Sequence, residues 1–131
     1  MNYQPAIDLT LAALPDTEAI YLFGSQARDD THSGSDVDLA VLTTAPLDAL
    51  VRFDLQERIA SCLHCSVDLI DLRTASTVMR VQVLEHGIVL YERNSGNRQA
   101  FEATALSAYA RLNEERRGII HDIRQRGRVH G

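Results

Sequence analysis

The stretch Gly24–Val41, GSQARDDTHSGSDVDLAV, holds the residues that decide the fold and its chemistry. Gly24 and Ser25 follow a short apolar run, ten mostly polar residues come next, and a second apolar run then carries Asp36 and Asp38. Strands that feed a core normally exclude charge. Residues i and i+2 of a strand project from one face, so the two carboxylates should lie side by side while their neighbours point into the core.

Two carboxylates placed that close repel each other and raise each other's pKa unless a cation lies between them. Mg²⁺ suits such a pair, because it takes oxygen ligands and leaves positions for water and phosphate. A solvated strand face is the commoner use of Asp-x-Asp taken alone. The preceding Gly24 and Ser25 favour a site, because a glycine there lets the backbone approach a ligand and the next N–H groups can hold phosphate. Together the two features predict a nucleotide site.

A third carboxylate is expected on the next strand, within SVDLIDL. Asp68 and Asp71 are an odd number of residues apart, so a regular strand presents only one of them to a given face. Asp68 is favoured because it lies nearer the middle of the strand. Asp71 is the alternative, or it caps the following turn.

The charge of the chain is unevenly distributed. The 131 residues suit one compact domain with an appendage, and the net charge of −5 does not indicate a nucleic-acid binder. Residues 1–92 hold 14 acids and 5 arginines, a balance of −9, whereas residues 93–131 hold 4 acids and 8 arginines, a balance of +4. The basic tail is therefore expected to meet something acidic, such as a partner protein. All 13 fixed cations are arginines, which excludes a P-loop lysine or a Schiff base.

Two further features bear on the location of the protein. Cys62 and Cys65 form a C-x-x-C spacing without a second pair for zinc, so we expect reduced structural residues. Apolar runs fall well short of the roughly 20 residues that a membrane span needs. We therefore expect a cytoplasmic protein without a membrane partner.

The hydrophobic pattern predicts an α/β (α+β) fold, a small mixed β-sheet with helices packed on it, followed by a long C-terminal helix. The expected helices cover residues 7–14, 46–63, 77–85 and 98–124, and the expected strands cover residues 19–23, 37–42, 67–72 and 88–91. Pro46 should lie in the first turn of its helix and Thr77 should cap the next. Residues 1–92 form the expected domain, and residues 93–131 form a linker and a basic helix or tail.

One face of the long C-terminal helix carries an apolar stripe. The body, a second copy or a partner should bury this stripe, which contains Phe101, Ala105, Ala108, Leu112, Ile119 and Ile123.

The order Gly24, Ser25, ten residues, Asp36-x-Asp38, set between two strands, resembles the signature of the DNA polymerase beta-like nucleotidyltransferase superfamily. The segments YLFGSQAR, SGSDVDLAV and VDLIDLRTAS are similar to the minimal nucleotidyltransferase (MNT) family over roughly residues 19–92. That family often has Arg-Gly where this chain has Arg28 and an aspartate, a departure confined to the loop. The resemblance implies a polymerase beta-like fold that transfers a nucleoside monophosphate from a triphosphate to an acceptor hydroxyl and releases pyrophosphate.

The same resemblance implies the roles of the carboxylates. Asp36 and Asp38 would hold Mg²⁺ on the triphosphate of ATP, the expected substrate. Asp68 would complete a second metal position and help to deprotonate the acceptor, since two metals can stabilise the entering and the leaving oxygen.

The resemblance also implies a set of nucleotide contacts. Gly24 and Ser25 would grip the β and γ phosphates, and Arg28 and Ser35 would complete the nucleotide-binding set. Arg28 would offset triphosphate charge. As an ordinary surface arginine it would instead pair with a neighbouring aspartate.

Proteins of this family at this size are commonly paired with a HEPN-domain protein, by the same resemblance. In such pairs the HEPN protein is a ribonuclease toxin and the MNT protein is the antitoxin, which can adenylylate a toxin tyrosine with ATP. The resemblance implies a hetero-oligomer with a HEPN partner and no direct contact with nucleic acid. Two alternatives stay open: an antitoxin that acts by binding alone, and a small-molecule transferase of the aminoglycoside-modifying type.

Overall fold

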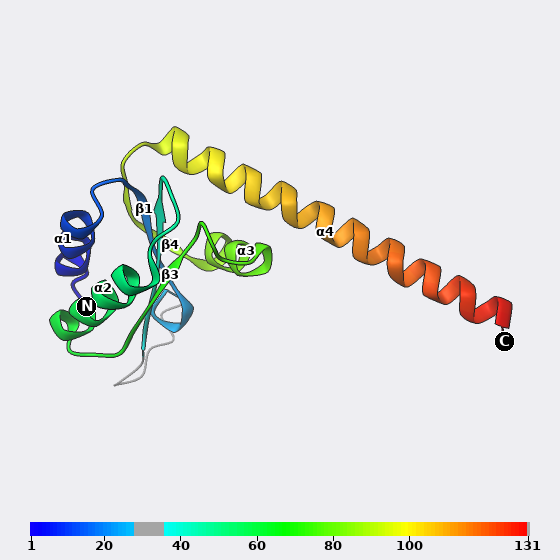
Figure 1. Cartoon of the computed structure of the whole chain (residues 1–131), viewed down its shortest axis with the longest axis horizontal. Coiled ribbons are helices and arrows are strands. Elements are labelled where there is room, and N and C mark those ends of the chain that lie inside the picture. Colours follow the sequence, from blue (N-terminus) through cyan, green and yellow to red (C-terminus); the bar gives the residue numbers. More distant parts are fainter. Residues whose placement is uncertain (28–35, 131) are drawn as a thin grey trace.

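The computed structural model of the chain describes residues 1–27 and 36–130, with side chains as far as residue 125. A four-stranded mixed sheet lies at the centre, α1 and α2 cover one face, α3 and the start of α4 cover the other, and α4 runs out beyond the body (Figure 1). The expected fold class is confirmed. The helices are α1 (Gln4–Ala13), the 3-10 turn η1 (Gly24–Gln26), α2 (Ala49–Leu63), α3 (Thr77–His86) and α4 (Ser95–His130), and the strands are β1 (Thr17–Phe23), β2 (Val37–Thr43), β3 (Val67–Asp71) and β4 (Ile88–Glu92).

The strand order of the sheet is β3-β2-β1-β4. β1 pairs antiparallel with β2 and with β4, whereas β2 and β3 pair in parallel through the crossover helix α2. Phe23 lies opposite Asp38 in the first pairing, and Asp38 lies opposite Asp68 in the last. The end of β1 and the beginnings of β2 and β3 therefore meet at one end of the sheet.

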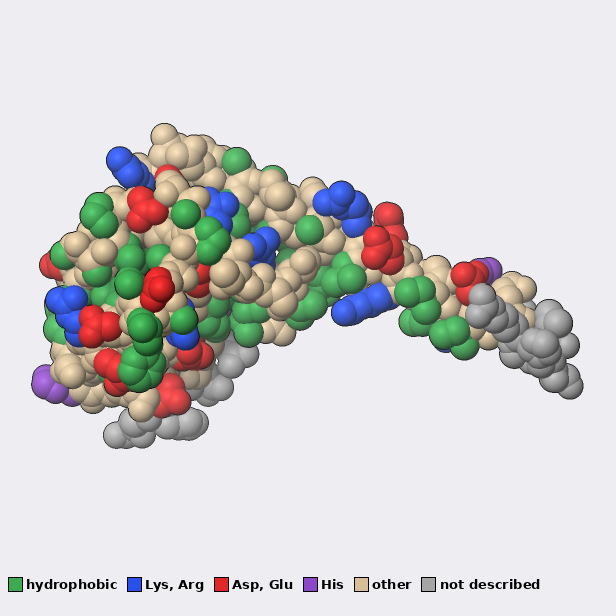
Figure 2. All heavy atoms as spheres, in the orientation of Figure 1, with side chains coloured by type: hydrophobic (Ala, Val, Ile, Leu, Met, Phe, Trp, Pro, Cys, Tyr) green, Lys and Arg blue, Asp and Glu red, His purple; other side chains and the backbone are tan. Residues whose placement is uncertain are grey.

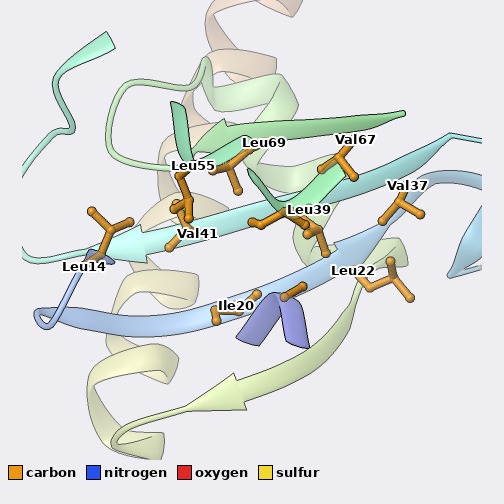
Figure 3. Close-up of a cluster of buried hydrophobic side chains, with 11 residues drawn as sticks. Leu14, Ile20, Leu22, Val37, Leu39, Val41, Leu55, Val67 and Leu69 are labelled. Carbon is orange, nitrogen blue, oxygen red and sulfur yellow. The ribbon is translucent and has the colours of Figure 1, made fainter. Parts of the chain in front are cut away.

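The face of the sheet under α1 and α2 carries the larger core. Val37, Leu39 and Val41 alternate along β2 and are all buried here, as the sequence predicts (Figure 3). Leu55 and Ile59 of α2 pack onto them at helical spacing. Each fully buried side chain of this kind contributes about 1.5–3 kcal/mol relative to an exposed one, so this face holds the sheet and α2 together.

The opposite face carries a smaller core, which includes Tyr21, Leu42 and Val83. The Tyr21 hydroxyl donates to the Glu102 carboxylate at 2.9 Å, and Arg98 pairs with the same carboxylate at 2.7 Å. Burial and the adjacent Glu102 carboxylate raise the pKa of Tyr21 far above its ordinary value, so the hydroxyl keeps its proton. These bonds fix the first turns of α4 against β1.

Three expected helix starts are wrong, because α1 begins at Gln4, α2 at Ala49 and α4 at Ser95 rather than at residues 7, 46 and 98. α3 begins at Thr77 as expected, but its expected cap is wrong. α2 begins at Ala49 rather than Pro46, because the Asp48 carboxylate accepts hydrogen bonds from the backbone N–H groups of the first turn. α3 is capped by Ser76 rather than Thr77, since the Ser76 hydroxyl accepts from the backbone N–H of Met79 at 3.1 Å.

The last helix is longer and less covered than expected. α4 has 36 residues and begins at Ser95, inside the segment expected to be a linker. Ala105 is buried against the body, but Ile119 and Ile123 are 60% and 61% exposed, so the body itself does not bury the outer part of the stripe. In the described residues, no helix is both long and apolar enough to cross a membrane. Cys62 and Cys65 are free thiols, as expected.

Candidate nucleotidyltransferase site

A glycine turn follows β1 at the end of the sheet away from the start of α4 (Figure 1). Gly24 has φ +72°, a conformation that side-chain-bearing residues rarely adopt, and it opens the 3-10 turn to Gln26. A Cβ placed on Gly24 would lie 2.1 Å from Oδ2 of Asp38. Glycine is therefore required twice here, for its backbone angle and for the close approach of the Asp38 carboxylate.

Three carboxylates lie beside this turn. Asp38 is the second residue of β2 and is half-buried, and the register places it directly opposite Asp68 of β3. Asp36 lies just before β2, where the Val37 N–H donates to the Ser66 carbonyl at 2.9 Å. Asp36 and Asp68 are both exposed. The structure thus brings the three predicted carboxylates together at one end of the sheet.

The carboxylates repel one another, and the raised pKa of Asp38 reflects this repulsion. Loss of solvent raises the pKa of Asp38 above its ordinary value, and the charges of Asp68 and then Asp36 raise it further. A group in this position gains from a nearby cation, which would relieve the repulsion. This is the electrostatic setting in which a carboxylate set accepts a metal ion or the cationic side of a ligand.

Asp71 has a different role from Asp68. It is buried, and its two carboxylate oxygens accept from the backbone N–H groups of Leu47 and Arg73, each at 2.9 Å. Its carbonyl also accepts from the N–H of Ala75 at 3.0 Å. Asp71 therefore organises the loops after β2 and β3, which agrees with the turn-capping alternative, while Asp68 faces Asp38.

The remaining predicted residues divide into described and undescribed ones. Ser25 is half-buried inside the 3-10 turn, next to Gly24. Arg28 and Ser35 lie outside the described residues. Tyr3 also supports this turn, because its hydroxyl donates to Oε1 of Gln26 at 3.3 Å. The two residues are 23 positions apart, so no local sequence pattern predicts this contact.

The described residues contain no group of three or more His, Cys, Asp or Glu side chains arranged to hold a metal ion by themselves. Mg²⁺ is usually held by one or two carboxylates together with substrate phosphates and water, rather than by an all-protein cage. The Asp36 and Asp38 pair beside the glycine turn fits this mode of binding.

The family described as "Polymerase beta, Nucleotidyltransferase" matches residues 6–96, which include the glycine turn and all three carboxylates. The chain belongs to this nucleotidyltransferase family. This family generally uses ATP and a divalent metal ion.

Two curated relatives carry a more specific name. The chain is 38% identical over 123 residues to the protein adenylyltransferase MntA of Shewanella oneidensis, an alignment that covers 94% of this chain and 88% of that protein. It is 35% identical over 75 residues to the probable protein adenylyltransferase MntA of Haemophilus influenzae, covering 56% of this chain and 66% of that one. This member of the nucleotidyltransferase family is thus a homologue of protein adenylyltransferases.

Solved structures agree with this placement along nearly the whole chain. A crystal structure of a toxin-antitoxin with AMP-PNP matches with a TM-score of 0.86 and 38% identity, covering 94% of this chain and 98% of that chain. A structure of a tri-AMPylated Shewanella oneidensis HEPN toxin in complex with MNT antitoxin matches with a TM-score of 0.77 and 37% identity, covering 91% and 92%. Both matches extend well beyond residues 6–96, so the nucleotidyltransferase fold and much of α4 are shared.

Proposed function

We propose that this chain is an antitoxin that transfers AMP from ATP to a tyrosine hydroxyl of a HEPN-domain ribonuclease toxin and so inactivates it. One observation carries the proposal: the chain places the glycine turn and three carboxylates at one end of the sheet. The homology to protein adenylyltransferases and to antitoxins in complex with HEPN toxins supports the choice of a protein acceptor.

The chemistry assigns one role to each group. The tyrosine oxygen forms a bond to the α-phosphorus of ATP, the bond from that phosphorus to the β-phosphate bridging oxygen breaks, and pyrophosphate leaves. Asp68 accepts the proton of the tyrosine hydroxyl or orients the group that does. The backbone N–H groups of the turn at Gly24 and Ser25 hold the β and γ phosphates. Arg28 and Ser35 complete the nucleotide contacts.

Asp36 and Asp38 are proposed to hold Mg²⁺, which would neutralise charge on the triphosphate and on the leaving pyrophosphate. The raised pKa of Asp38 supports this assignment, because a half-buried carboxylate flanked by two others is stabilised by a cation. Asp68 would contribute to a second metal position. The Asp38 carboxylate lies so close to the Gly24 backbone that a Cβ on Gly24 would come within 2.1 Å of its Oδ2, which supports one nucleotide spanning both parts of the site.

The two segments of the chain are proposed to have different roles. Residues 1–92 would act as the nucleotidyltransferase domain, and residues 93–131 would hold the toxin. The exposed isoleucines of α4, together with the balance of +4 over residues 93–131, suit a partner that offers apolar and acidic side chains. The tail would then bring the toxin tyrosine to the acidic end of the sheet.

The test is transfer of label from α-labelled ATP to the purified HEPN partner in the presence of Mg²⁺. Wild-type protein should label the partner, and the Asp36→Asn/Asp38→Asn variant should label it at least about 100-fold more slowly. Asp54→Asn is the matched control, because Asp54 is an exposed carboxylate on α2, away from the site. Equal labelling by wild-type and the double variant would contradict the proposal.

A second candidate is an antitoxin that neutralises the toxin by binding alone. The exposed apolar residues of α4 favour it, since such a surface can occlude a partner without chemistry. The two candidates differ in one measurement, the neutralisation of toxin activity by the Asp36→Asn/Asp38→Asn variant. Full neutralisation at equal stoichiometry supports occlusion, and loss of neutralisation supports adenylylation.

A further inference from the structure

A cavity of about 370 Å³ lies between the sheet, α3 and the first turns of α4. Its polar and aromatic lining comes from Glu18, Arg73, Arg80, Asn97, Phe101 and Thr104. Leu42 also lines it and lies four residues along β2 from Asp38, which corresponds to about 13 Å at strand spacing. The cavity is therefore separate from the carboxylate site and lies at the opposite end of the sheet.

The two arginines of this cavity are held in place. Arg73 donates through Nε to the Thr43 carbonyl at 2.6 Å, and Arg80 donates through Nε to the Leu72 carbonyl at 2.8 Å. Both guanidinium groups stack on the Phe101 ring, each 5.4 Å from its centroid. Arg80 also donates through Nη2 to the Arg73 carbonyl at 2.7 Å, whereas within the described residues no acceptor bonds either Nη group of Arg73, which lines the cavity.

The charge around these arginines is unbalanced. In the part of the chain that the structure describes, neither Arg73 nor Arg80 has a carboxylate within ion-pair distance. Yet residues 1–92 carry 14 acids and only 5 arginines, and two of those five meet here. Both guanidinium groups contact the Phe101 ring and line the same cavity, and planar guanidinium groups suit phosphate oxygens.

We propose that this cavity binds a small phosphate monoester that also carries hydroxyl groups, with Arg73 and Arg80 as the phosphate ligands. Glu18 is proposed to select for the hydroxyl groups of the ligand. It is 9% exposed and lines the cavity, and its Oε2 accepts from Nδ2 of Asn97 at 3.2 Å. Such a carboxylate disfavours a bare polyanion and favours a ligand with hydroxyl donors, such as a nucleoside monophosphate or a sugar phosphate.

A ligand in this position touches three elements at once. Arg73 lies in the loop after β3, Arg80 lies on α3, and Asn97 and Thr104 lie on α4. Basic side chains lie where the body meets α4 (Figure 2). Binding would hold the root of α4 against the sheet, and a ligand that binds only the folded state raises its stability. This site goes beyond the proposed transferase function and does not depend on it.

The test is calorimetric titration of AMP into full-length Asp36→Asn/Asp38→Asn protein in EDTA, which suppresses metal-dependent nucleotide binding at the carboxylate site. We expect one equivalent of AMP to bind. Adding Arg73→Gln or Arg80→Gln should weaken binding about tenfold or more, the loss expected for a charge-assisted hydrogen bond. Arg58→Gln is the matched control on the exposed side of α2 and should leave the affinity unchanged.

Arg73 and Arg80 also donate to backbone carbonyls, so their substitution could destabilise the fold. A second variant tests the site without removing these bonds. Thr104→Glu adds a carboxylate to the cavity wall from an exposed position on α4 and leaves both arginine contacts in place. It should weaken AMP binding while circular dichroism and the unfolding midpoint stay near those of the parent. Inorganic phosphate should bind more weakly than AMP. No binding at millimolar AMP, an affinity unchanged by Thr104→Glu and Arg73→Gln, or phosphate binding as tight as AMP would overturn the proposal.

Discussion

At the scale of single residues, the contact between Gly24 and Asp38 sets the geometry of the site. Asp38 supplies charge, and Gly24 supplies the space that lets this charge lie against the backbone of the turn. The pairing of Phe23 with Asp38 fixes the contact, because it aligns the end of β1 with the start of β2. The glycine and the aspartate are therefore one structural unit, although 13 residues separate them in sequence.

Gly24→Ala tests this unit. The variant should be less stable by at least about 1–2 kcal/mol, the cost of a left-handed conformation for a residue with a side chain. It should also lose transfer activity, since the new Cβ displaces the Asp38 carboxylate. Gly118→Ala is the matched control: a Cβ there meets nothing within 4 Å, and alanine in a helix gains up to about 1 kcal/mol over glycine. Thermal unfolding and AMP transfer measure both effects, and a fully active Gly24→Ala would contradict this view.

Asp38→Asn tests the repulsion. Because the folded-state pKa of Asp38 lies above its ordinary value of 3.8, the folded protein is destabilised as pH rises through that pKa and the carboxyl ionises. Asparagine removes this cost, so without divalent ions the variant should unfold at a higher temperature than the wild type at pH 7.5. The difference should shrink as the pH falls toward 4. A difference that is constant with pH, or of opposite sign, would show that Asp38 is not the strained group.

At the scale of elements, the side chains of β3 alternate between the two faces of the sheet, so its two aspartates have different roles. Asp68 emerges beside Asp38 and is exposed, whereas Asp71, at the end of the strand, is buried and bonded to two backbone N–H groups. One short strand therefore holds a carboxylate for the site and another for the loops around it.

The pair Asp68→Ala and Asp71→Ala tests this separation. Asp71→Ala leaves two partly buried N–H groups without a partner and should lower the free energy of unfolding by about 3 kcal/mol. Transfer activity should survive at urea concentrations well below the unfolding midpoint of the variant. Asp68→Ala should change stability by less than about 0.5 kcal/mol and lower the transfer rate at least about 100-fold. Urea unfolding and single-turnover transfer give the two readings. The reverse pattern would assign the third carboxylate to Asp71.

Much of the secondary structure was predictable from local sequence patterns. Alternation in VDLAV placed Val37 and Leu39 in the core and Asp38 on the other face, and the odd spacing of Asp68 and Asp71 separated them. Helix caps were harder to predict, because Asp48 and Ser76 act through short capping bonds that compete with equally good neighbours. Contacts across the fold carry no local signal.

At the scale of the whole molecule, an acidic body carries a long basic helix that it covers only in part. Ala105 is buried, but apolar side chains lie in the open on the outer part of α4 (Figure 2). The helical spacing of apolar residues predicted an apolar stripe on α4, but it did not predict how much of that stripe the body covers. The Arg73 and Arg80 cavity was equally hidden, since it depends on the packing of α3 and α4.

Ile119→Glu/Ile123→Glu tests the role of the outer helix. Both side chains are exposed, so the unfolding temperature of the isolated protein should hardly change. If α4 holds the HEPN partner, affinity should fall about tenfold or more, because charges enter an apolar contact. His121→Glu/Gln125→Glu adds the same charges on the opposite side of α4 and should bind normally. Binding by calorimetry that is equal for both variants would remove α4 from the interface.

The central claim is that one nucleotide joins the glycine turn to the carboxylates. The most direct measurement is a crystal structure of the chain with Mn²⁺ and a non-hydrolysable ATP analogue, with the metal located by anomalous scattering. We predict a metal peak bound by Asp36 and Asp38, with the β and γ phosphates against the backbone of Gly24 and Ser25. Metal and triphosphate located away from these four residues would contradict the account.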